Sequence, residues 1–155
     1  MVMSPKSLLR HPACISNIPE LGPGTTFKPI IADELSAAAA KKVKRVILCS
    51  GKVYYDLKEA IDKNAVEGIA ILRVEQLYPL DQKALEAALQ PYANAEKIWL
   101  QEEPANMGSW TYIEMLLPHM QLRLISRKAA ASPATGYKKL HDENQERIIK
   151  EAITY

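Results

Sequence analysis

The chain has 155 residues, enough for one domain with a hydrophobic core and too few to expect two. Its residues are 48% hydrophobic and 25% charged, the usual values for a soluble globular protein. The net charge of +2 gives no reason to expect a nucleic acid or an anionic membrane as a partner. The apolar runs are far shorter than the roughly 18 residues that a transmembrane helix needs.

The N-terminus and the cysteines indicate a reducing compartment. Residues 1–6 lack the charged start and the apolar stretch of a signal peptide. Of the two cysteines, Cys49 lies in an apolar run and is expected to be a small buried hydrophobe. A reduced intracellular protein therefore fits better than a disulfide scaffold.

Residues 1–42 are predicted to form an extended, proline-rich arm. Five prolines and two glycines punctuate the first 30 residues too often for long helices. An extended segment of this kind is expected to pack along another surface. The alanine run at residues 37–40 is interpreted as a helical turn or a spacer.

A regular domain is predicted over residues 43–155. Residues 43–49 are rich in β-branched side chains and read as a strand that turns at Ser50-Gly51 into a helix over 53–64. Residues 69–74 form the second predicted strand. It is apolar on both faces for most of its length, as in parallel sheets covered by helices.

The second half of the chain continues this alternation. Asp81 is expected to cap a helix that carries an apolar stripe, and residues 97–101 follow as a strand. A helix over 109–120, capped by Ser109, a strand over 122–126 and a helix over 138–153 complete the pattern. The order βαβαβαβα with right-handed crossovers predicts an α/β fold, a three-layer sandwich with a largely parallel sheet.

Ligands of such sheets gather at the carboxyl ends of the strands, where two segments are candidates. Ser50-Gly51-Lys52 resembles the end of a phosphate-binding loop, but the glycine that the full motif needs is replaced by Val46, so a tight turn is the better interpretation. In residues 101–110, the adjacent Glu102 and Glu103 should point in opposite directions. A structural or interface role is therefore favoured over catalysis.

Two further segments carry cations. In residues 126–137, Arg127 and Lys128 lie among small residues that allow close approach, so this loop either holds an anion or a partner carboxylate or is a plain connecting loop. In the arm, Lys6, Ser7 and Arg10 have the composition of a phosphate site, although composition alone favours a solvated basic stretch. The histidines and cysteines show no metal-ligand spacing, and we predict no metal site and no catalytic residue.

Several motifs together resemble one family, the 2-oxoglutarate dehydrogenase decarboxylating components. The matching segments run in order over nearly the whole chain: residues 3–12 (MSPKSLLRHP), 49–57 (CSGKVYYDL), 73–79 (RVEQLYP), 101–110 (QEEPANMGSW) and 132–136 (SPATG) followed by His141. The resemblance implies the C-terminal, transketolase-like domain of such an enzyme. That fold agrees with the sheet predicted from the pattern.

The resemblance also implies what the rest of the enzyme does. In the family, the full-length enzyme binds thiamine diphosphate and magnesium between two earlier domains of a dimer. It decarboxylates 2-oxoglutarate and transfers the succinyl group to the lipoyl arm of a second component, the succinyltransferase. The family's magnesium motif and catalytic histidines lie upstream, so no cofactor-binding residue is expected in this chain. The implied compartment is the bacterial cytoplasm, or the mitochondrial matrix for a eukaryotic chain.

For this chain itself, the resemblance implies roles in regulation and in assembly of the enzyme. Some family members respond to adenine nucleotides such as AMP, or to acetyl-CoA, near the junction of this domain with its neighbours. Phosphate contacts are expected from Ser7 and Arg10, ahead of Lys6. An interface role with the rest of the chain and the dimer mate is expected for a second set of residues: Glu102, Glu103, Asn106, Trp110 and Arg127.

Three hypotheses remain open at this point. The chain is a part of the dehydrogenase, inactive alone, that serves assembly and regulation. Alternatively, it is a free-standing module that binds an acyl-CoA or a nucleotide, or it is the same domain of a 2-oxoadipate dehydrogenase. An isolated domain of this kind should expose apolar surface meant for its partners, and we therefore expect it to self-associate.

Overall fold

The structure is a computed structural model of the chain, and it describes residues 5–33 and 35–155. Its elements follow in chain order: η1 (Lys6–Leu8), η2 (Ile18–Leu21), β1 (Ile30–Ala32), α1 (Ala37–Ala40), β2 (Arg45–Cys49), α2 (Val53–Lys63), β3 (Ile69–Val74), α3 (Gln82–Leu89), η3 (Gln90–Tyr92), β4 (Glu96–Pro104), α4 (Trp110–Leu116), η4 (Pro118–Met120), β5 (Arg123–Arg127) and α5 (Lys138–Ile153).

The described strands form one five-stranded sheet in the order β1-β3-β2-β4-β5. The four strands β3, β2, β4 and β5 are parallel, and β1 pairs with the edge of β3 in the antiparallel sense. Strand β2 is central, and its first residue, Arg45, aligns with Ile69 on one side and Glu96 on the other. The carboxyl ends of β2 and β4 therefore meet at one edge of the sheet, together with the end of β5.

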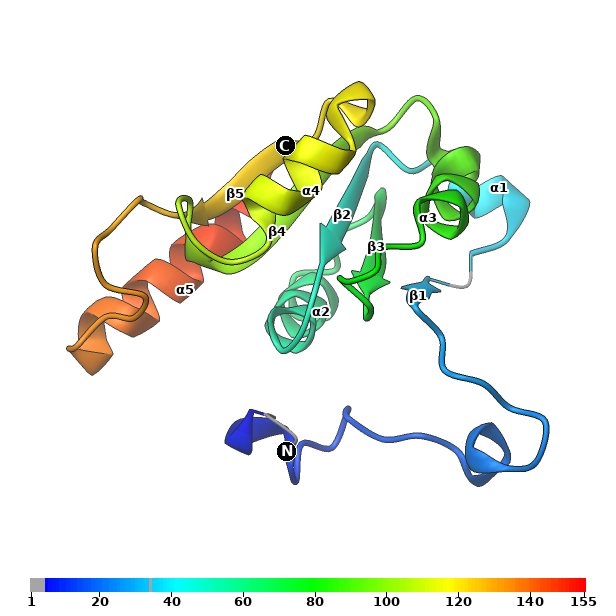
Figure 1. The fold of residues 1–155 in the computed structure, drawn as a ribbon, viewed down its shortest axis with the longest axis horizontal. Helices are drawn as coiled ribbons and strands as arrows, with labels where there is room; N and C mark the ends of the chain where they lie inside the picture. Colours follow the sequence, from blue (N-terminus) through cyan, green and yellow to red (C-terminus); the bar gives the residue numbers. More distant parts are fainter. Residues whose placement is uncertain (1–4, 34) are drawn as a thin grey trace.

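Helices cover both faces of the sheet, as Figure 1 shows. Helices α2 and α5 contact each other on one face, and α1, α3 and α4 contribute to the core of the other. Alternate residues of β2 divide between the two cores: Val46 and Leu48 face the first core, Ile47 and Cys49 the second. This arrangement confirms the predicted three-layer α/β fold with a largely parallel sheet.

Most predicted elements are confirmed with small shifts of their ends. The strand over 69–74 and the helix over 138–153 have the predicted bounds, and the Asp81 carboxylate accepts a hydrogen bond from the Ala84 amide, 2.9 Å away, as a helix cap. The alanine run forms one helical turn, capped by Ser36. Cys49 is fully buried, and burial raises the pKa of its thiol to about 12.

Two predictions about element ends were wrong. No side chain caps α4, although Ser109 was expected to do so, and the helix ends at Leu116 instead of continuing to residue 120. Residues 118–120 form a separate 3₁₀ turn that begins at Pro118, which has no amide hydrogen to continue the α-helix.

The expected arm contains a strand that the pattern did not predict. Ile30–Ala32 extends the sheet at its β3 edge. The strand is anchored at its end by Asp33, whose carboxylate accepts a hydrogen bond from the Ile71 amide while its own amide donates to the Ile71 carbonyl. Before this strand, residues 5–29 form two short 3₁₀ helices joined by turns and extended backbone (Figure 1).

The arm before β1 exposes large apolar side chains. Five of them are more than 60% exposed, which is unusual for so short a stretch: Leu9, Ile15, Ile18, Leu21 and Phe27. One point of the arm packs on the domain, where the His11 ring lies 5.2 Å from the Tyr55 ring of α2. The large apolar side chains named above remain exposed to solvent.

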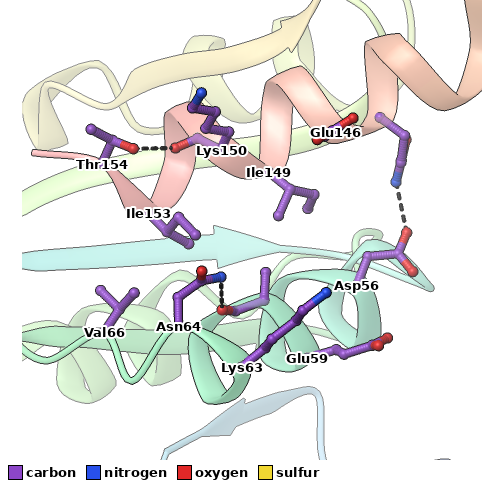
Figure 2. A pocket seen from close by; sticks show the side chains of 12 residues that line it. Asp56, Glu59, Lys63, Asn64, Val66, Glu146, Ile149, Lys150, Ile153 and Thr154 are labelled. Atoms are coloured by element: carbon purple, nitrogen blue, oxygen red, sulfur yellow. Dashed lines mark hydrogen bonds between the residues drawn. The ribbon is translucent and has the colours of Figure 1, made fainter.

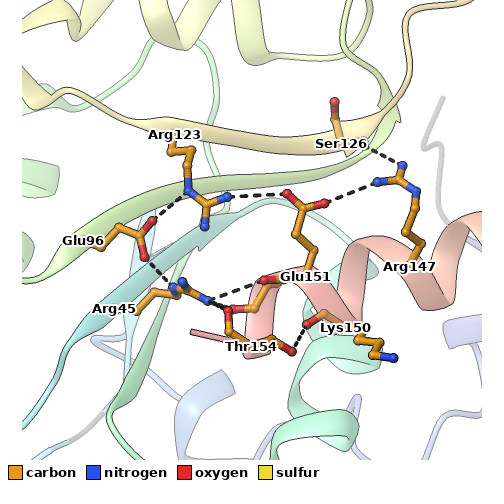
Figure 3. Close-up of polar contacts among 9 residues, drawn as sticks. Arg45, Glu96, Arg123, Ser126, Arg147, Lys150, Glu151 and Thr154 are labelled. Carbon is orange, nitrogen blue, oxygen red and sulfur yellow. Dashed lines mark hydrogen bonds and ion pairs between the residues drawn. The ribbon is translucent and has the colours of Figure 1, made fainter.

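A buried arginine ties the amino-terminal edge of the sheet to the end of the last helix (Figure 3). Arg45 is 4% exposed; its Nε donates to Glu96 at 2.7 Å, and its Nη1 donates to the carbonyls of Ala152 and Thr154 at 2.8 and 2.6 Å. The Tyr155 ring covers the guanidinium at 4.9 Å. The single side chain thus joins β2, β4 and the carbonyls that α5 leaves unpaired at its end.

Glu96 is shared between two arginines. Burial on its own would raise the pKa of the Glu96 carboxyl, but hydrogen bonds from Arg45 and Arg123 outweigh burial and hold the pKa below its ordinary value. Arg123 also reaches Glu151 of α5, which in turn accepts from Arg147 (Figure 3). The outer part of this network is exposed, whereas Arg45 is not.

We predict that the two arginines differ sharply in their contribution to stability. Arg45→Met should lower the free energy of unfolding by about 2–3 kcal/mol, because it leaves buried helix carbonyls without a donor. Arg123→Met should cost about 0–1 kcal/mol, because its ion pairs are solvent-exposed. Urea unfolding of both variants measures the difference; equal losses would contradict the assigned role of Arg45.

Candidate functional site

A polar cluster occupies the edge of the sheet where the parallel strands end. Its members come from the loop after β2, the ends of β4 and β5, and the first half of the helices α2 and α5. We call it the carboxyl-edge cluster, and it consists of Lys52, Asp56, Glu102, Arg127, His141 and Gln145. This is the edge at which ligands of α/β sheets are generally found.

Gln145 is the centre of the cluster. Its amide nitrogen donates to Asp56 at 2.8 Å and to Glu102 at 3.0 Å, and its amide oxygen accepts from Nη2 of Arg127 at 2.9 Å. Lys52 forms an ion pair with the same Glu102 carboxylate. The amide thereby separates a region with two carboxylates and one ammonium from the guanidinium on its other side.

Arg127 is 7% exposed and forms no ion pair with a carboxylate among the described residues. Its Nη1 lies 3.3 Å from Nδ1 of His141, and its Nη2 donates to the Gln145 amide. The remaining donor, Nε, is buried and has no hydrogen-bond partner in the described structure. A buried guanidinium without a carboxylate partner is uncommon, because the charge loses its water without compensation.

The loop after β4 is built around the amide of Gln101, which is 4% exposed. Its nitrogen donates to the carbonyls of Pro104 and Met107 at 3.1 and 2.8 Å. Its oxygen accepts from the Trp99 indole and the Trp110 amide, both at 3.1 Å. All hydrogen-bonding capacity of this side chain is therefore used to shape residues 104–110.

The same loop is fastened to the loop that follows β5. The Asn106 side chain donates to the Ala130 carbonyl at 2.9 Å and accepts from the Ala130 amide at 3.0 Å. Gly108 adopts φ +69°, and a Cβ there would lie 3.0 Å from Cβ of Glu103, so the tight loop requires glycine. The two loops consequently behave as one unit above β4 and β5.

A cavity of about 340 Å³ lies where these loops meet. Its lining combines the two cations Arg127 and Lys128 with Pro104, Asn144 and small loop residues between 129 and 135. None of the described residues that line it carries a carboxylate. The cavity is therefore electropositive.

The adjacent acids of the β4 end do not share a target. Glu102 is half-buried and turned toward Lys52 and Gln145, whereas Glu103 is exposed. Their arrangement does not place two carboxyl groups on one substrate atom. Of the other residues considered for interface roles, Asn106 is exposed and Trp110 is half-buried against the core.

A second hollow of about 680 Å³ lies between α2 and α5 (Figure 2). Its floor is apolar, with Ile149 and Ile153 of α5 facing Val66 and the α2 side. Its rim is charged with both signs, through Asp56, Glu59 and Glu146 on one hand and Lys63 and Lys150 on the other. A mixed rim of this kind selects no class of ligand.

A third cavity lies between the arm and α2. Lys6 and Ser7 lie in η1, and Arg10 follows; all three side chains are exposed. The next residues, His11–Ala13, line a cavity of about 680 Å³ together with Tyr54, Tyr55 and Lys58 of α2. Burial, and then a hydrogen bond with Cys14, raises the pKa of Tyr55 to about 12, so its hydroxyl stays neutral at physiological pH.

Sequence reasoning missed two members of the carboxyl-edge cluster, His141 and Gln145, as contacts of Arg127. The usable signal was their spacing of four, which puts both on one face of the last helix. Among the described residues, no group of three or more His, Cys, Asp or Glu side chains is placed to hold a metal ion. In the described part of the chain, every helix is too short or too polar to cross a bilayer.

Comparison with known proteins gives a consistent result. A profile described as 2-oxoglutarate dehydrogenase C-terminal matches residues 15–153. The chain belongs to this family. It shares 47% identity with "Oxoglutarate dehydrogenase" of Buchnera aphidicola subsp. Baizongia pistaciae, over 99% of this chain and 17% of that protein.

Further relatives carry the name "2-oxoglutarate dehydrogenase E1 component". The protein of Rickettsia felis is 43% identical over 99% of this chain, and that of Haemophilus influenzae is 43% identical over 100%. The chain covers 16% and 17% of these relatives, respectively. It is therefore similar to about one sixth of each relative, and it belongs to the family of their C-terminal domain.

We predict that Gln101 is the residue on which the shape of the loop depends. Gln101→Leu should lower the free energy of unfolding by about 2–3 kcal/mol, because it leaves the buried Trp99 indole and loop carbonyls without partners. The exposed neighbour substitution Glu103→Gln should change it by less than about 0.5 kcal/mol. Thermal unfolding compares the variants; a Gln101→Leu protein as stable as the parent would contradict the assignment.

Proposed function

We propose that this chain is the assembly and regulatory domain of a thiamine-diphosphate-dependent 2-oxoglutarate dehydrogenase first component, and that it is inactive alone. The observation that carries this proposal is the pairing of 99% coverage of this chain with 17% coverage of its relative at 47% identity. The complete enzyme would oxidatively decarboxylate 2-oxoglutarate and transfer the succinyl group to a lipoyl-bearing second component. The compartment that we propose is the cytoplasm, because the relatives named above are bacterial.

The described residues fit a supporting role. The polar groups at the sheet edge are committed to one another through Gln145, and the acids of β4 do not converge. Thiamine diphosphate supplies the carbanion chemistry of such enzymes when bound. We propose that the cofactor and its magnesium ion are bound by the remainder of the enzyme, as the resemblance to the family implies, and we derive no step from them.

The exposed apolar arm supports the assembly role. Five large apolar side chains between residues 9 and 27 are more than 60% exposed, and exposed apolar surface of this extent is typical of protein–protein interfaces. We propose that this surface belongs to the rest of the same enzyme and its dimer mate. Glu103 at the end of β4 and Asn106 on the loop after it are both exposed, and we propose that they contribute to the same interface.

The cavity between the arm and α2 supports the regulatory role. Two tyrosines and His11 offer flat faces to a purine ring, while Lys6, Ser7 and Arg10 lie a few residues away on the same arm. These groups suit the phosphates of AMP or acetyl-CoA. The substrate alternative, a 2-oxoadipate dehydrogenase, has the same domain architecture; a free-standing module is not favoured, because the relatives carry this segment as part of a much longer chain.

The assembly role predicts self-association of the isolated chain. At high micromolar concentration, sedimentation velocity should show dimers or larger species, because the arm apolar residues find cover only in one another. Replacing Ile18 and Leu21 with serine should shift the distribution toward monomer. Leu140→Ser, on the exposed face of α5, serves as the control and should leave it unchanged. A monomeric parent chain at every concentration would refute this prediction.

The regulatory role predicts binding of AMP or acetyl-CoA through the arm. Calorimetric titration of the purified chain should detect one of these ligands, and Arg10→Ala should weaken it by about 1–3 kcal/mol, the contribution of a charge-assisted contact. Lys139→Ala, a similarly exposed cation on α5, is the matched control and should have no effect. Thiamine diphosphate should not bind. Heat of binding that Arg10→Ala leaves intact would remove the phosphate role from the arm.

A further inference from the structure

The carboxyl-edge cluster leaves one charge without an electrostatic partner. Arg127 carries a guanidinium charge, and its side-chain contacts are Nδ1 of His141 and the amide oxygen of Gln145. No carboxylate pairs with it anywhere in the described residues, although Glu102 and Asp56 lie on the other side of the Gln145 amide. A buried guanidinium in this state favours an anion close by.

The side chain with the unfilled donor also borders a cavity. Nε of Arg127 is the one buried side-chain nitrogen or oxygen of the described residues that finds no partner. Buried donors are nearly always satisfied, and an exception needs a physical reason. Arg127 also lines the cavity of about 340 Å³, so its guanidinium group lies at the wall of this space.

The rest of the cavity offers further donors. Lys128 adds an exposed ammonium group and Thr135 a hydroxyl, whereas the Ser132 hydroxyl already donates to the Ala134 carbonyl at 2.7 Å. Within residues 128–135, only the Ala130 amide donates to another described residue, so the other non-proline amides remain available. Helix α5 begins shortly afterwards at Lys138 without a capping side chain and without an acid in its first turn.

We propose that this cavity is a binding site for a phosphate group, with Arg127 and Lys128 as its charged contacts. The donors approach from the guanidinium, the ammonium and the loop backbone, which suits the several acceptor oxygens of a tetrahedral oxyanion better than a planar carboxylate. The volume is at the lower end for small-molecule sites and fits a small phosphate ester or free phosphate. Asn106 holds the loop in place through Ala130.

This site is separate from the arm segment to which regulatory contacts were attributed above, and it does not depend on that proposal. Its charged residues lie at the end of β5 and directly after it, whereas Lys6, Ser7 and Arg10 precede β1. Different substitutions therefore test the two sites. Arg10→Ala tests one and Lys128→Met the other.

The test is a titration of the full 155-residue chain with inorganic phosphate, followed by amide NMR shifts. Phosphate should move the amide signals of residues 128–135, and Lys128→Met should weaken the apparent affinity about five- to tenfold. Lys128 is exposed, so this variant keeps the fold. Lys139→Met, an equally exposed lysine outside the cavity, and Arg10→Ala should both leave the loop shifts unchanged.

Two further titrations, with acetate and with AMP, separate the possible sources of the signal. Acetate at equal concentration should move the loop amides much less than phosphate does, and AMP should move them if a phosphate ester is accepted as well as the free ion. The absence of loop shifts with phosphate would overturn the proposal. So would loop shifts that Lys128→Met leaves at full strength, or equal shifts with acetate.

Discussion

The buried guanidinium of Arg45 is the interaction on which the arrangement of this domain depends. It lies at the start of the central strand, where the sheet offers a carboxylate from the neighbouring strand and α5 ends with unpaired carbonyls. One planar side chain satisfies both, which fixes where the last helix stops on the sheet. The opposite end of α5 is fixed by that placement, and with it the positions of His141 and Gln145 at the carboxyl edge of the sheet.

This geometry explains why the candidate binding residues gather at the carboxyl edge of the sheet, opposite Arg45. The crossover after β5 returns the chain along residues 128–137 so that α5 begins beside the strand ends. Gln101 shapes the loop after β4, and Asn106 transfers that shape to the returning loop. A rigid scaffold that carries shaped loops is the usual way in which α/β proteins build a binding surface.

Much of the fold follows from the sequence because its determinants are local. The strand at residues 69–74 was predicted from a continuous run that is apolar on both faces, and the last helix from Ile148, Ile149 and Ala152 on its inner face. Strand β1 was missed because it has three residues and follows Pro29. It becomes a strand only because β3 offers a free edge. Ser109 was mistaken for a cap because the residue type is right, whereas the backbone there is already helical, with φ −95° and ψ −6°.

The site was less accessible to sequence reasoning, because its contacts join distant segments. Arg127 was recognised as a cation in a loop of small residues, but its burial depends on partners 14 and 18 residues further along and on a helix placed by Arg45. Nothing in the sequence distinguishes Gln145 and Gln101 from other glutamines. Only the fold shows that each side-chain amide forms hydrogen bonds with several partners at once.

The two buried arginines finally show how structural and binding roles differ. Arg45 faces a carboxylate and backbone carbonyls, with an aromatic ring above it, so its charge and its geometry are both satisfied within the chain. Arg127 is buried to nearly the same degree, but its side chain contacts a His141 ring nitrogen and the Gln145 amide instead of a carboxylate, and one donor is left over. Desolvation penalises both charges alike, and only one is compensated. The uncompensated one lies against a cavity lined by another cation, which is why we attribute stability to the first and recognition of an anion to the second.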